Sequence, residues 1–174
     1  RSLISSPRYG ECRVWGVDNG SVEALTLELK DHYERETEQV RFVSLDEPFN
    51  FSQIVNFGVK HTQGEHVVLM NNDIEVINCD WLEAMLEHSQ RSEIGAVGAK
   101  LYYPDDTIQH AGIAIGIGSY AGHPHKHVEG GYAGYLNRLH NIQNVSAVTG
   151  AMMMVKREVY EAVGGFDEHL FKVA

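Results

Sequence analysis

The chain has 174 residues, of which 43% are hydrophobic and 22% charged, a composition that indicates a soluble globular domain and excludes a disordered tail, a coiled coil or a collagen-like repeat. With 14 Lys and Arg against 24 Asp and Glu, the formal net charge is −10, which disfavours nucleic acids and anionic membranes as partners. The two cysteines, Cys12 and Cys79, offer neither a zinc pair nor a disulfide framework, as is typical of a reducing compartment.

In the first half of the chain, short apolar runs alternate with helical patterns. Strands are predicted at residues 12–17, 40–44, 66–70 and 94–102, and helices at residues 22–35, 51–60 and 81–90. Leu25, Leu29 and either His32 or Tyr33 recur on one face of the first helix. Asn50 with Gln53 has N-cap spacing, and Asp80 begins a capping-box pattern for the last of these helices. This alternating order predicts a parallel sheet covered by helices.

The second half of the chain has a different pattern. Residues 108–118 are apolar with regularly spaced glycines, residues 147–156 are predicted to form a strand filled with methionine, and residues 157–163 are predicted to form a short helix. Between them lies a long loop rich in glycine and histidine. A loop of this length inside a compact domain is usually functional or disordered.

The two ends of the chain indicate a piece of a longer protein. The sequence begins at Arg1 without a methionine and stops at Ala174 without a turn or a polar tail. No signal peptide opens it. No stretch reaches the roughly 20 apolar residues that a membrane helix needs, so no transmembrane segment is predicted.

Polar residues follow two of the predicted strands directly. Asp18 and Asn19 follow the first strand, and Asn71, Asn72 and Asp73 follow the third. Ligands of a parallel α/β sheet bind at the carboxyl ends of its strands. Carboxylates there could bind a nucleotide base or ribose, or hold a divalent cation against a diphosphate. Ordinary turns explain the same residues, because Asp18 could simply accept backbone N–H bonds from the next helix.

Histidines give two further candidate sites. His123, His125 and His127 alternate along one segment, so their side chains could share a face and bind zinc. Because Lys126 interrupts the group and no cysteine lies nearby, a solvated loop with incidental histidines is favoured. His110 opens an apolar run, which places it near the sheet either as a core histidine or as a site residue. No serine or cysteine lies in a nucleophile motif, and no phosphate-binding Gly-Lys loop is found.

Taken in order, the motifs of the chain resemble those of family 2 glycosyltransferases, which have a GT-A nucleotide-sugar-binding fold. The resemblance is closest to bacterial rhamnosyltransferase and O-antigen-type members, and it covers nearly the whole chain. The matching stretches are Val17-Asp18-Asn19-Gly20-Ser21, Phe49-Asn50-Phe51-Ser52, Asn56-Phe57-Gly58, Gly64-Glu65, Leu69-Met70-Asn71-Asn72-Asp73, Trp81-Leu82, Gly95-Ala96-Val97-Gly98, Gln109-His110-Ala111-Gly112, Thr149-Gly150-Ala151 and Gly164-Gly165-Phe166-Asp167-Glu168.

The resemblance implies an α/β fold with a mixed, mostly parallel sheet and helices on both faces, with residues 1–106 as the nucleotide-binding half and residues 107–174 as the acceptor-side half. It implies that Asp18 contacts the nucleotide base, and that Asp73 binds the divalent cation (Mn²⁺ or Mg²⁺) that bridges the donor diphosphate. The other residues implied in nucleotide binding are Asn19, Ser21, Asn56, Asn71 and Asn72.

On the acceptor side, the resemblance implies that Thr149, Gly150 and His110 contact the donor sugar or the acceptor, and that Asp167 and Glu168 approach the acceptor. Two parts of the family pattern are not found: the first apolar strand, and the aspartate expected as the general base after the Gly-Gly-Phe-Asp-Glu segment. We therefore expect a catalytic domain truncated at both ends, inactive by itself, with a vacant sheet position that favours self-association.

The expected activity is transfer of a hexosyl group, with inversion, from a nucleotide-diphosphate sugar to a hydroxyl of a glycan or lipid-linked saccharide, in bacterial cell-surface polysaccharide synthesis. The expected location is the cytoplasm or the inner face of the membrane. Two alternatives remain open from the sequence. One is a nucleotidyltransferase-like enzyme with the same fold, and the other is a non-catalytic module that binds metal through its histidine loop.

Overall fold

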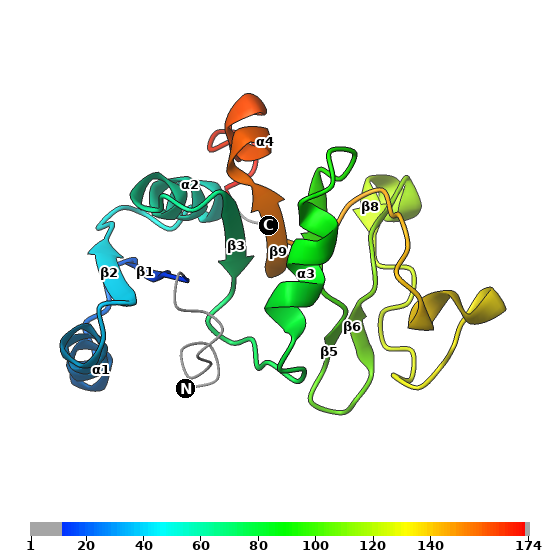
Figure 1. Cartoon of the computed structure of the whole chain (residues 1–174), viewed down its shortest axis with the longest axis horizontal. Helices are drawn as coiled ribbons and strands as arrows, with labels where there is room; N and C mark the ends of the chain where they lie inside the picture. The colour runs from blue at the N-terminus through cyan, green and yellow to red at the C-terminus, as the bar shows by residue number, and fades with distance from the viewer. Residues whose placement is uncertain (1–11, 173–174) are drawn as a thin grey trace. The chain divides into compact units, whose positions relative to one another are not determined.

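The computed structural model describes residues 12–172, which form two compact units (Figure 1). The first unit contains the chain up to Val67 and again from Arg157, and the second contains Val68–Lys156. The two halves predicted at residues 1–106 and 107–174 differ in the ligand that each would bind. The division into compact units does not test that difference, so the two halves stay a prediction.

The first unit contains a parallel β-α-β motif. Strand β1 (Val14–Asp18) pairs with β2 (Val40–Ser44) in parallel register, and helix α1 (Ala24–Glu36) connects them (Figure 1). Parallel neighbours need a crossover of this kind, and a helix is the usual one. Asp18 is the last residue of β1. Its carboxylate therefore lies at the carboxyl end of the strand, as the sequence predicted.

Helix α1 forms as predicted, but its apolar face is exposed. Leu25 is 77% exposed and Leu29 is 52% exposed. The half-buried positions are instead Thr26, Lys30 and Tyr33, which recur at helical spacing. This face contacts β2, and the ammonium group of Lys30 lies 5.8 Å from the centroid of the Phe42 ring. The inner face of α1 therefore packs through Lys30 and its half-buried neighbours rather than through buried leucines.

Helix α2 (Phe51–His61) begins where the sequence predicted. The Asn50 side chain accepts a hydrogen bond from the Gln53 N–H at 3.2 Å, which satisfies one of the free donors of the first turn. The helix packs on β1 at Gly58, where an added Cβ would lie only 2.8 Å from Val17. The short helix α4 (Arg157–Ala162) belongs to the same unit.

Most of a second sheet, with the strand order β3 (His66–Met70), β9 (Met152–Lys156) and β4 (Ala96–Gly98), belongs to the second unit. Strand β4 runs antiparallel to β9. Helix α3 (Trp81–Ser89) packs against β4 and β9 (Figure 1). The buried core is formed by Met85, Leu101, Met152 and Met154. The methionine run thus fills core space, as the sequence predicted.

The simple parallel order predicted for the fourth strand is wrong. Strand β9 lies between β3 and β4, and residues 94–102 divide into β4 and β5 (Leu101–Tyr102). Strand β5 turns back to pair antiparallel with β6 (Ile108–His110). Gly98 permits the close approach at the end of β4, because a Cβ there would lie 2.6 Å from Val148.

The capping box predicted before α3 is not formed by Asp80. This residue occupies the N-cap position, but its side chain makes no capping hydrogen bond, and its φ of −101° and ψ of 15° are not the extended conformation of most N-caps.

The segment predicted as one apolar run over residues 108–118 is also interrupted. Gly112 has a φ of 103°, and a Cβ there would lie 2.6 Å from Val145. The chain continues as β7 (Ala114–Ile115), a short 3₁₀ turn η2 (Ile117–Ser119) and β8 (Ala121–Gly122), which pairs with β7. The long loop then contains the 3₁₀ segment η3 (Tyr135–His140).

Over residues 12–172, no helix has both the length and the apolar character to cross a bilayer.

Candidate functional site

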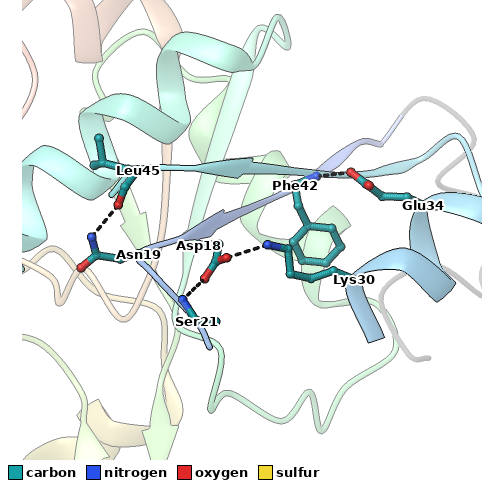
Figure 2. Close-up of polar contacts among 7 residues, drawn as sticks. All are labelled: Asp18, Asn19, Ser21, Lys30, Glu34, Phe42 and Leu45. Atoms are coloured by element: carbon teal, nitrogen blue, oxygen red, sulfur yellow. Dashed lines mark hydrogen bonds and ion pairs between the residues drawn. The ribbon is translucent and has the colours of Figure 1, made fainter. Parts of the chain in front are cut away.

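The Asp18 carboxylate is held at the end of β1 by two contacts (Figure 2). Its Oδ2 lies 2.6 Å from the Lys30 Nζ, and its Oδ1 accepts a hydrogen bond from the Ser21 N–H at 3.0 Å. The side chains of Asp18 and Lys30 are 11% and 17% exposed. The Lys30 hydrogen bond, followed by those of Ser21, lowers the pKa of Asp18 to about 2. This carboxylate is therefore ionised at neutral pH.

Lys30 is a site residue that the sequence reasoning missed. It lies 12 positions after Asp18, on the half-buried face of α1. The sequence could have indicated Lys30 through its helical spacing with Thr26 and Tyr33. The leucines on the other side of the helix form a stronger apolar pattern, so the sequence favoured the wrong face as the buried one.

Asn19 and Ser21 support the loop around Asp18. The Asn19 amide donates to the carbonyl oxygens of Leu45 and Glu47, at 2.7 and 2.8 Å, which ties the loop after β2 to the end of β1 (Figure 2 shows the Leu45 bond). The turn role predicted for Asp18 is thus present, since it caps the Ser21 N–H. Nucleotide contacts by Asn19 and Ser21 stay a prediction.

Asn56 is buried and its amide is fully used within the first unit. Its Oδ1 accepts from the Tyr160 hydroxyl at 2.5 Å and from the Phe166 N–H at 2.9 Å. Its Nδ2 donates to the Phe166 carbonyl and to Glu168 Oε1, both at 2.8 Å. An amide offers two N–H groups and two lone pairs, so none is left for another partner. A nucleotide contact by Asn56, which stays a prediction, would require one of these bonds to break.

Asp167 and Glu168 both make hydrogen bonds within the first unit. Asp167 Oδ1 accepts from the N–H groups of His169 and Leu170, each at 2.9 Å, and the Leu170 bond followed by the His169 bond lowers the pKa of Asp167. A general base works best with a pKa near the working pH, so this environment disfavours that role. The Glu168 carbonyl accepts from the Asn50 amide at 2.9 Å. Contact of these residues with an acceptor stays a prediction.

Asp73 lies in the exposed turn that follows β3, together with Asn71 and Asn72. Within residues 12–172, no hydrogen bond or ion pair occupies its carboxylate. The same part of the chain contains no group of three or more His, Cys, Asp or Glu that could hold a metal ion. A single unoccupied carboxylate fits Mg²⁺ or Mn²⁺ when phosphate oxygens and water complete the coordination, because these cations prefer oxygen ligands.

His110 and Thr149 meet in the second unit. His110 is 2% exposed on β6, and its Nε2 accepts from the Thr149 N–H at 3.4 Å. Its Nδ1 lies 3.0 Å from the Nδ1 of His123, a contact that the sequence did not reveal. Burial, and next the neighbouring His123, lower the pKa of His110 to about 4. His110 is therefore neutral at pH 7, and it is a hydrogen-bonded core histidine.

These residues line an open pocket of about 140 Å³. Of the implied sugar contacts, His110 and Thr149 reach this pocket, and Gly150 is the half-buried residue that follows Thr149. The pocket lining is Leu101, Tyr103, Gln109, His110, His123, Lys126, Thr149 and Ala151. All of these residues belong to the second unit.

Among the residues that the structure describes, the alternating histidines do not come together as a group that could hold a metal ion. His123 contacts His110, whereas the His127 ring stacks on Tyr103 at a centroid distance of 4.9 Å. His125 Nδ1 is buried without a hydrogen-bond partner in the described structure. The three side chains thus have separate environments, and His127 has a positive φ of 63° that breaks the extended geometry on which the prediction relied.

Comparison with known proteins gives one family. The model of glycosyl transferase family 2 matches residues 1–164. The uncharacterized protein y4gI of Sinorhizobium fredii is 48% identical over 173 residues, which cover 99% of this chain and 19% of that protein. The O-antigen biosynthesis protein RfbC of Myxococcus xanthus is 38% identical over 170 residues, 96% of this chain and 13% of that protein. The chain thus spans less than a fifth of each relative.

A solved structure has the same fold. It is the mannosyltransferase PcManGT from Pyrobaculum calidifontis in complex with GDP-Man and Mn²⁺, with a TM-score of 0.60 and 19% identity. The match covers 90% of this chain and 39% of the solved chain. The α/β fold class predicted from the sequence, a GT-A fold, is confirmed, and so is the resemblance to the family.

Proposed function

Because the chain belongs to glycosyl transferase family 2, we propose that its protein transfers a hexosyl group from a nucleotide-diphosphate sugar to a hydroxyl of a glycan or lipid-linked saccharide, with inversion. Two similarities support this proposal: the structural neighbour was solved with GDP-Man and Mn²⁺, and one relative is an O-antigen biosynthesis protein. Within the chain, the observation that carries the proposal is the ionised Asp18 carboxylate at the carboxyl end of β1.

Asp18 is suited to accept hydrogen bonds from a nucleotide base or ribose. Its location at a strand end is where α/β folds bind nucleotides. The Lys30 ammonium fixes one oxygen and keeps the group ionised, and the Ser21 N–H fixes the other. A carboxylate has about four lone pairs, and the hydrogen bonds with Lys30 and Ser21 do not use all of them. The contacts therefore orient the carboxylate without using its full capacity as an acceptor.

Asp73 is the residue that would hold a divalent cation, with Asn71 and Asn72 beside it in the same turn. Such a cation, when bound, offsets the negative charge of the leaving nucleoside diphosphate. With a single carboxylate in this turn, cation affinity is expected to depend on the diphosphate. Thr149, Gly150 and His110 are proposed to contact the sugar or acceptor, with the glycine-rich loop at residues 120–144 as an acceptor-side cover.

Calorimetric titration of the chain with GDP, UDP and dTDP, each with and without Mn²⁺, tests this function. We expect one nucleoside diphosphate to bind, and Mn²⁺ to tighten its binding. Asp18→Asn is expected to weaken binding by about tenfold, because an amide cannot reproduce both carboxylate acceptors; a charged acceptor contributes about 1.5–3 kcal/mol. Asp73→Asn should abolish the Mn²⁺ dependence while leaving the metal-free affinity unchanged.

Two acidic residues serve as matched controls. Asp31 lies on α1 with a 72% exposed side chain, and Glu75 lies two residues after Asp73. Asp31→Asn and Glu75→Gln remove the same charge and should leave both affinities unchanged. If none of the three nucleotides binds, or if the controls weaken binding as much as Asp18→Asn does, the proposed function is wrong.

A further inference from the structure

The Thr149 backbone fixes the tautomer of His110. A backbone N–H can only donate, so the His110 Nε2 that receives it must be unprotonated. The proton of neutral His110 then lies on Nδ1, which is 3.0 Å from the Nδ1 of His123. His110 therefore donates to His123 rather than accepting from it.

This direction determines the protonation of His123 in turn. Its Nδ1 accepts from His110, so the hydrogen of the neutral ring lies on Nε2. The reversed arrangement would place a hydrogen on His110 Nε2, directly opposite the Thr149 N–H. Among the described residues, His123 Nε2 has no hydrogen-bond partner, and His123 lines the pocket. The Thr149, His110 and His123 chain thus supplies a donor with a fixed direction.

The described side chains that line this pocket include a positive charge and no negative one, unlike the composition of the whole protein. The chain has a formal net charge of −10, yet no Asp or Glu is found among the described residues that line the pocket. Lys126 is its one ammonium group, and it lies 5.9 Å from the centroid of the Tyr103 ring. The pocket, with a volume of about 140 Å³, is open and can admit a small group.

We propose that this pocket is an anion-binding subsite for a carboxylate or phosphate group of a saccharide substrate, with His123 Nε2 as the directed donor and Lys126 as the countercharge. His110 acts as a positioning residue that holds the His123 ring. That the ligand is a saccharide depends on the proposed function, whereas the inferred anion binding depends only on residues of the second unit. Charge-assisted hydrogen bonds from fixed donors are the usual means of holding such groups.

NMR of the imidazole nitrogens tests the tautomer chain directly. In the wild-type chain at neutral pH, His110 is expected to be protonated on Nδ1 and His123 on Nε2. His110 protonated on Nε2 would overturn the inference. Changing His110 to Gln should keep an acceptor for Thr149 but release the His123 ring, which should then show both tautomers in exchange.

Binding is tested by chemical-shift titration with inorganic phosphate, glucuronate and glucose. Phosphate binding without glucuronate binding would identify a phosphate group as the ligand, and the reverse would identify a sugar carboxylate. We expect His123→Asn, which keeps an acceptor for His110 but lacks the Nε2 donor, and Lys126→Gln each to weaken anion binding about tenfold. Lys60→Gln, at an exposed lysine of the first unit, is the matched control and should bind normally.

Equal binding of glucose and the anions, no binding of either anion, or wild-type affinity in both pocket variants would overturn the subsite. The His110 tautomer, read again in His123→Asn and Lys126→Gln, shows whether the pocket has kept its structure. The nucleotide titration described above tests Asp18 and Asp73, neither of which lines this pocket, so its failure would leave the anion result interpretable.

Discussion

The ion pair between Asp18 and Lys30 sets the charge of the candidate nucleotide contact. Replacing Lys30 with Met removes the first cause of the low pKa of Asp18, so that pKa should rise from about 2 toward the ordinary value of 3.8. A carbon-detected NMR titration of the carboxylate measures this shift. Lys60→Met removes a lysine outside the site and should leave Asp18 unchanged; an equal shift in both variants would show that overall charge, rather than this pair, controls Asp18.

At the scale of single residues, the sequence was sufficient to place polar groups at or just after the end of a strand, whereas their contacts with ligands stay predictions. Asp18 and Asp73 were found because each follows an apolar run, and strand ends are binding positions in α/β sheets. Lys30 was not assigned as the partner of Asp18, nor His123 as the partner of His110, because a contact across 12 or 13 residues depends on how the intervening elements turn.

At the scale of secondary-structure elements, α2 and its N-cap take part in hydrogen bonds between near neighbours in the sequence and in hydrogen bonds between residues far apart. Its start was predictable, because the Asn50 cap acts on a residue three positions away. The role of Asn56 was not, since its partners lie 104 to 112 residues later. The placement of β9 between β3 and β4 escaped prediction for the same reason: a pairing of distant segments leaves no local pattern.

Asn56 should therefore control the stability of the segment from Gly164 to Phe171. Asn56→Ala leaves the buried Tyr160 hydroxyl and the Phe166 peptide group without their partner, which should cost about 2–4 kcal/mol. Urea unfolding measures this as a lower midpoint. Asn78→Ala, at an exposed position, should change stability by less than about 0.5 kcal/mol.

A second variant at the same place separates packing from hydrogen bonding. Gly165 has a φ of 74°, and a Cβ added there would lie 2.6 Å from Asn56 Oδ1. Gly165→Ala should therefore displace the same amide and destabilise the protein, while the Asn56→Ala, Gly165→Ala double variant should lose less than the sum of the two single losses. Additive losses would show that the two residues act independently.

For the whole molecule, acid should act in two separate pH windows, one for each unit. His110 in the second unit has a pKa of about 4, below the 6.5 of an ordinary histidine, so the unfolded chain binds a proton that the folded chain excludes. Stability must then fall as pH decreases from about 6.5 to about 4, by up to about 3 kcal/mol. Asp18 in the first unit contributes stability above about 3.8 that is lost as pH falls through about 2.

Urea unfolding at a series of pH values distinguishes these windows. His110→Gln keeps an acceptor for the Thr149 N–H but cannot be protonated, so it should flatten the stability curve between pH 6.5 and 4 and leave the lower window intact. Asp18→Asn should do the reverse. Because the sequence pI is about 5.4, the measurements belong at low protein concentration, where neutral net charge does not promote association. A pH dependence unchanged by His110→Gln would mean that other histidines carry the acid sensitivity, and that His110 is not the buried neutral group its contacts indicate.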